Sequence, residues 1–115
     1  MKLGEARRTF SRLLVDLLHW ATEQGMHYAF DEVMQHQGKG HMAGSLHYSG
    51  CAADVLLYDE DSNYLTGKTI ETGSEGYQNL GEKWETMHEL CRWGGRFNDG
   101  GHLSFAPFNL FGDNA

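Results

Sequence analysis

The chain has 115 residues, of which 40% are hydrophobic and only one is proline, so a single folded domain over residues 1–115 is expected. Its net charge is −7, and the acidic excess lies between residues 40 and 90, where two lysines stand against nine acids. This balance argues against nucleic acid as a partner, because such binding depends on clustered lysine and arginine. No apolar run approaches the roughly eighteen residues that a membrane span requires, so membrane insertion is not expected.

The first element that the sequence predicts is an amphipathic helix over about residues 5–24. Its apolar side chains recur at the spacing of one helix face, namely Phe10, Leu13, Leu14, Leu17, Leu18 and Ala21. This helical spacing also differs from the unbroken apolar core of a secretory signal, so no signal peptide is predicted. Gly25 stands where a left-handed residue ends a helix, and Met26–Phe30 then indicates a short strand.

The middle of the chain predicts a buried strand followed by a hairpin. Ala52–Tyr58 is apolar except for one aspartate, and Asp59–Asn63 has the composition of a turn that returns the chain as Tyr64–Thr66. The turn has the spacing Asp59-x-Asp61-x-Asn63 of a calcium loop. It lacks the glycine and the glutamate that such a loop needs further on, so calcium is not expected there.

The last third predicts a second helix and two more strands. The helix is expected over about residues 75–91, with Ser74 as its N-cap and the pair Gly94-Gly95 ending the segment. Strands are expected at Arg96–Asn98 and at His102–Phe105, joined by a turn at Asp99-Gly-Gly. The whole pattern predicts an α+β fold, a small antiparallel sheet flanked by helices.

Two histidines and one carboxylate could together form an open zinc site. Zinc in a catalytic site takes three protein ligands and keeps a fourth position for water, and His47, Asp54 and His102 supply such a set. Asp54 lies among apolar residues, where burial of an unpaired carboxylate would destabilise the fold by roughly several kcal/mol. Asp99, three residues before His102, is the best placed general base and acid for a metal-activated water.

Less specific interpretations of these residues also exist. Aspartate and glycine are common in tight turns, so Asp99-Gly-Gly-His102 taken alone is most often only a turn. Histidines are more often surface or hydrogen-bonded residues than metal ligands, and the remaining five are expected to be of that kind. These five are His19, His27, His36, His41 and His88.

The spacing of these residues resembles the zinc D-alanyl-D-alanine peptidase superfamily, which also includes lysostaphin-type enzymes and the hedgehog signalling domain. The first motif is Ser45-x-His47-x-x-Gly50-x-Ala52-x-Asp54. The second, Trp93-Gly94-Gly95-Arg96-Phe97-x-Asp99-x-x-His102, is similar to that of short phage endolysins that act as L-alanyl-D-glutamate peptidases. The likeness runs from about Asp31 to Phe105.

The resemblance implies a zinc-dependent peptidoglycan endopeptidase that hydrolyses the stem peptide at the L-alanyl-D-glutamate bond, by zinc-bound hydroxide with Asp99 as general base and acid. It implies His47, Asp54 and His102 as the Zn2+ ligands and Ser45 as a substrate-binding residue. Such an enzyme would act as a monomer and would stay in the host bacterial cytoplasm until it is released to the cell wall. A D-alanyl-D-alanine carboxypeptidase and a non-catalytic zinc-containing binding domain are the alternatives.

One departure from the family pattern concerns the loop before Ser45. Family members often read Glu-Val-Tyr-Arg there, and the arginine reaches toward the scissile carbonyl, whereas this chain reads Glu-Val-Met-Gln over residues 32–35. Gln35 could donate a neutral hydrogen bond instead, or Lys39 or Arg96 could supply the cation. Loss of one such donor commonly lowers the rate about 100-fold, so a slow enzyme is one expected consequence.

Overall fold

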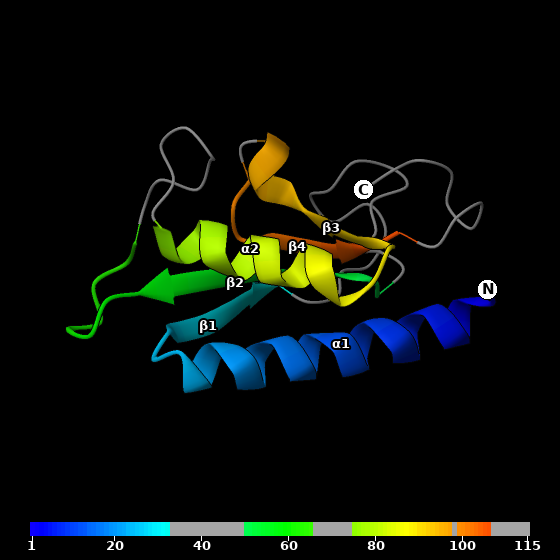
Figure 1. Cartoon of the computed structure of the whole chain (residues 1–115), viewed down its shortest axis with the longest axis horizontal. Coiled ribbons are helices and arrows are strands. Elements are labelled where there is room, and N and C mark those ends of the chain that lie inside the picture. The colour runs from blue at the N-terminus through cyan, green and yellow to red at the C-terminus, as the bar shows by residue number, and fades with distance from the viewer. Residues whose placement is uncertain (33–49, 66–74, 98, 107–115) are drawn as a thin grey trace.

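The computed structural model of the chain describes residues 1–32, 50–65, 75–97 and 99–106, and within these ranges two helices pack on a four-stranded antiparallel sheet (Figure 1). The α+β class is therefore confirmed. The strand order is β1-β2-β4-β3. The elements are α1 (Leu3–Glu23), β1 (His27–Glu32), β2 (Ala52–Tyr58), α2 (Glu75–Met87), β3 (Cys91–Trp93), the 3-10 helix η1 (Gly94–Phe97) and β4 (His102–Phe105).

Helix α1 forms where the apolar spacing predicts it. Its buried side chains are Ala6, Phe10, Leu13, Leu14, Leu17, Leu18 and Ala21. The helix is followed by Gly25, whose φ of 80° is in the left-handed region that favours glycine, and the chain turns there into β1. None of the described helices is long and apolar enough to cross a membrane.

The core lies between the two helices and one face of the sheet. The rings of Phe10 in α1 and Trp84 in α2 meet edge to face, with their centroids 5.8 Å apart. The indole Nε1 of Trp84 donates a hydrogen bond of 2.9 Å to the carbonyl of Ser104, which ties α2 to β4. The phenol oxygen of Tyr77 accepts the N–H of Leu57 at 2.9 Å and ties α2 to β2 in the same way.

Strand β2 has the predicted bounds, but its side chains alternate between two environments. Ala53, Val55 and Leu57 are buried in the core, whereas Asp54 and the residues at positions 56 and 58 are only partly buried on the opposite face. The predicted strand is therefore fully buried on one face and only partly buried on the other. The alternation follows from the period of two in any strand, because both helices cover the same side of the sheet.

The chain returns along β2 after the turn, as the sequence predicts, and the structure describes this return as far as residue 65. Tyr64 forms a single antiparallel bridge with Tyr58, and Leu65 donates its N–H to the carbonyl of Leu57 at 2.9 Å; residue 66 lies outside the described ranges. The side chain of Asp59 closes the turn, because its Oδ1 accepts the N–H groups of Asp61 at 2.9 Å and of residue 63 at 2.8 Å.

The segment between α2 and β4 differs from the prediction. Helix α2 ends at Met87 and not near residue 91, because a tight turn follows in which Cys91 donates its N–H to the carbonyl of His88 at 3.1 Å. Cys91 then begins β3 opposite Phe105. The strand predicted at residues 96–98 is also wrong, since Gly94–Phe97 forms a 3-10 turn and residue 98 lies outside the described ranges.

Candidate metal centre

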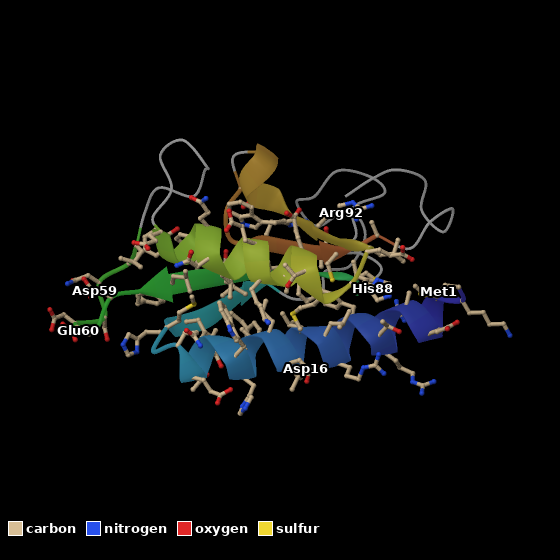
Figure 2. The ribbon with its side chains drawn as sticks, viewed as in Figure 1. Met1, Asp16, Asp59, Glu60, His88 and Arg92 are labelled. Atoms are coloured by element: carbon tan, nitrogen blue, oxygen red, sulfur yellow. The ribbon has the colours of Figure 1, made fainter. Side chains whose placement is uncertain are left out.

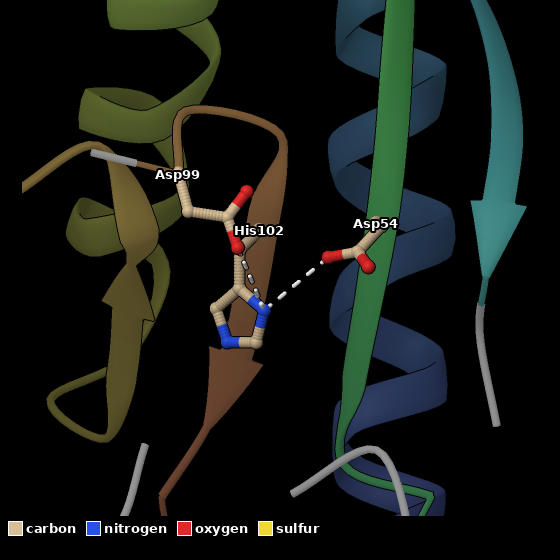
Figure 3. A group of neighbouring side chains, drawn as sticks. All are labelled: Asp54, Asp99 and His102. Carbon is tan, nitrogen blue, oxygen red and sulfur yellow. Dashed lines mark hydrogen bonds and ion pairs between the residues drawn. The ribbon is translucent and has the colours of Figure 1, made fainter. Parts of the chain in front are cut away.

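The register of the sheet brings Asp54 and His102 together. Strands β2 and β4 pair antiparallel with Asp54 directly opposite His102, and directly opposed residues place their side chains on the same face. That face is the one opposite the two helices, which lie behind the sheet in the close view (Figure 3). The two residues are 48 positions apart in the sequence, so only the pairing of the strands makes them neighbours.

The turn before β4 adds Asp99 to this pair. The Asp99 N–H donates to the carbonyl of Gly94 at 2.8 Å, and the His102 N–H donates to the carbonyl of Asp99 at 3.0 Å. The carbonyl of Gly101 accepts the N–H of Val55 at 2.8 Å, which fixes the turn to β2. These three bonds hold the backbone of the turn at both ends and on the side of the neighbouring strand.

The indole ring of Trp93 explains why positions 81 and 95 are glycine. A Cβ atom added at Gly81 or at Gly95 would collide with the indole ring of Trp93, so the ring occupies space that only glycine leaves open. The buried Nε1 of Trp93 donates a hydrogen bond of 2.8 Å to the carbonyl of Gly100. Trp93 therefore connects α2, η1 and the turn that carries Asp99.

Asp54, Asp99 and His102 form a group that could hold a metal ion (Figure 3). One potential ligand atom from each lies within 4.8 Å of the other two. Nδ1 of His102 is 3.3 Å from Oδ1 of Asp54 and 4.0 Å from Oδ2 of Asp99. The side chains of His102 and Asp54 are 11% and 21% exposed, whereas that of Asp99 is 54% exposed, so the first two form the inner part of the site.

The donor set and the spacing fit a metal ion. His102 Nδ1 and Asp54 Oδ1 form a hydrogen bond of 3.3 Å, which is longer than the about 2.7–2.9 Å of a charge-assisted pair. Two ligand atoms that each lie about 2.0–2.1 Å from a tetrahedral zinc ion are about 3.3–3.4 Å apart. Imidazole nitrogen and carboxylate oxygen therefore lie at the separation that two ligands of one tetrahedral ion would have.

Ser104 is a further polar residue on this face, and the sequence analysis did not identify it. It lies two residues after His102 on β4, it is fully buried, and its Oγ has no hydrogen-bond partner among the residues that the structure describes. A buried hydroxyl of this kind is uncommon in native proteins and often marks a bound water or ligand. A polar residue two positions after a candidate ligand histidine, on the same face of a strand, is the sequence signal that could have indicated it.

The remaining predicted site residues cannot be compared with the structure. His47, Ser45 and Gln35, together with Lys39, lie outside the described residues. The roles predicted for them as zinc ligand, substrate-binding residues and possible cation stay predictions. Of the predicted set, the structure thus brings Asp54, Asp99 and His102 together.

Comparisons of the sequence with family models and with curated proteins give no match. The case for a function therefore rests on the residues and their geometry.

Proposed function

We propose that the protein is a zinc-dependent peptidase that hydrolyses the stem peptide of bacterial peptidoglycan. The observation that carries this proposal is the grouping of Asp54, Asp99 and His102 on the face of the sheet opposite α1 and α2, with two inner residues and one more exposed carboxylate. The motif spacing that resembles zinc peptidases of the cell wall supplies the substrate class. His47 would complete the set of three protein ligands.

The two inner residues would hold the ion and the outer one would handle the proton. A bound zinc ion polarises a carbonyl and lowers the pKa of a coordinated water to about 7. Asp99 lies at the rim, where its Oδ2 is 4.0 Å from His102 Nδ1 and half of its side chain is exposed. A carboxylate in this position can reach both a water in the site and a substrate that arrives from solvent.

In the proposed reaction Asp99 moves one proton. The water oxygen attacks the scissile carbonyl carbon while Asp99 accepts a proton from the water. The carbon–nitrogen bond then breaks, and Asp99 returns the proton to the leaving amine. The products are a new carboxyl group and a new amino group, and Asp99 ends in its starting state, as a general base and acid must.

The bond cleaved is proposed to be that between L-alanine and D-glutamate, and the protein would reach it after release from the host cytoplasm. The alternative of a D-alanyl-D-alanine carboxypeptidase predicts a different product, free terminal alanine. The alternative of a non-catalytic zinc-containing domain predicts zinc binding without any product. Measuring products and zinc on the same sample separates the three.

The test of the proposed mechanism is Asp99→Asn. We expect this variant to digest peptidoglycan about 100-fold more slowly or worse, since proton transfer by a positioned side chain contributes about 10²–10⁴-fold, while zinc binding is retained. Asp16→Asn, on the exposed face of α1 (Figure 2), is the matched control and should keep the full rate. A wild-type rate in Asp99→Asn would refute the assigned role.

A further inference from the structure

A second site lies at the end of β2, away from the metal centre. A cavity of about 400 Å³ opens there between the connection from α1 to β1, the turn after β2 and the first turn of α2. Its described lining residues are Gly25, Met26, His27, Leu57, Tyr58, Asp59, Glu60, Leu65 and Gly76. A cavity of this size falls in the range of small-ligand sites.

The lining combines an apolar floor with an acidic rim. The partly buried Met26 and Leu65 supply the apolar part, and Asp59 and Glu60 supply two negative charges. Figure 2 shows both carboxylates at one end of the molecule, on the turn that follows β2. No lysine or arginine is among the described residues that line the cavity.

The charge of the rim is held in place by the backbone. Oδ1 of Asp59 accepts N–H groups from residues 61 and 63, and these hydrogen bonds lower the pKa of Asp59. The amino end of α2 reaches the cavity through Gly76 and carries only about half a positive charge, which two full negative charges outweigh. The cavity therefore favours a cation.

The chemistry of the floor selects the kind of cation. A hard metal ion such as calcium or magnesium gains nothing from Met26 or Leu65, whereas an alkyl chain that ends in an ammonium group can bury its methylenes against them. Tyr58 also lines the cavity, and an aromatic ring can bind an ammonium group on its face. An alkylammonium group fits both parts of the lining.

We propose that this cavity binds an alkylammonium group, such as the side chain of a basic amino acid in a peptide or the end of a free polyamine. The apolar floor holds the alkyl chain, and Asp59 and Glu60 hold the charged end. The site does not depend on hydrolysis at the metal centre, so it is tested by binding alone.

The experiment is an NMR titration of the full chain with Nα-acetyl-lysine methylamide, its norleucine analogue and 1,5-diaminopentane. We expect the lysine compound to shift the amide signals of Met26, Tyr58 and Glu60 and to bind about three- to tenfold more tightly than the norleucine analogue. Tighter binding of the lysine compound than of diaminopentane identifies a peptide side chain as the source; the reverse order identifies a free polyamine.

Substitutions inside and outside the cavity lining distinguish binding at this site from nonspecific attraction of a cation to an acidic protein. Glu60→Gln and Asp59→Asn should each weaken the lysine compound about two- to fivefold, whereas Asp61→Asn, on the same turn but outside the cavity lining, should not. Asp99→Asn should bind as the wild type does, even if the proposed peptidase activity proves wrong. Equal affinity for lysine and norleucine, or an equal loss in Asp61→Asn, would overturn the proposal.

Discussion

Gly94→Ala is the substitution that best tests how the metal centre is built. A Cβ atom at this position would lie 2.6 Å from Cβ of His102 and closer still to the carbonyl oxygen of Asp99. Carbon atoms in ordinary contact are about 3.5–4.0 Å apart, so the turn must move by about 1 Å to admit the methyl group. Both affected residues belong to the proposed site.

The expected magnitude follows from that displacement. A misplacement of about 1 Å can lower a rate about 100-fold, and overpacking of a tight contact typically costs about 1–3 kcal/mol of stability. We therefore expect Gly94→Ala to fold, to bind zinc more weakly and to digest peptidoglycan about 100-fold more slowly. The loss of activity should exceed what the loss of stability alone explains.

The assay compares zinc affinity, digestion rate and thermal unfolding of this variant with those of Gly4→Ala. Gly4 lies in α1, and an added Cβ there meets nothing within 4 Å, so alanine should leave site and rate unchanged. Wild-type zinc affinity and rate in folded Gly94→Ala would show that the close contact of Gly94 with the turn does not position Asp99 and His102.

Three further predictions concern the metal, the core and a buried thiol. Zinc at about 100 times its Kd should raise the unfolding midpoint by roughly 10 °C, and Asp54→Ala should abolish this rise in differential scanning fluorimetry. Trp84→Phe should lower the free energy of unfolding in urea by about 1–3 kcal/mol, because the carbonyl of Ser104 loses its buried donor; an unchanged midpoint would contradict this. Burial raises the pKa of Cys91 from 9.0 to about 12, so its thiol should react with Ellman's reagent at pH 8 only after unfolding, and stability should fall as the pH rises above about 9, since the unfolded chain releases this proton first. Rapid labelling of Cys91 in the native protein would refute the last prediction.

The parts of the fold that the sequence predicted correctly are those with a local pattern. Helix α1 and strand β2 have continuous apolar patterns of their own, and β4 begins directly after a glycine turn. The end of α2 was missed because Cys91 continues the helical spacing of apolar residues. Its actual partner is Phe105 across β3 and β4, and a pairing between strands is not visible in local spacing.

The candidate site shows the same division. Asp99 and His102 could be paired from their spacing, because a turn of two glycines keeps them close. The environment of Asp54 could not be predicted, since an apolar run does not reveal which alternate residues face the helices. A side chain at position 94 would collide with His102, and the sequence spacing does not predict this collision. It depends on how η1 packs against the turn.

The most direct test of the proposed peptidase is digestion of purified peptidoglycan with the wild-type chain, with and without a zinc chelator, followed by mass spectrometry of the new termini. The proposal predicts new amino groups on D-glutamate and new carboxyl groups on L-alanine, their loss with chelator and their return when zinc is added back. Digestion that continues unchanged in chelator, or the release of free alanine alone, would contradict it.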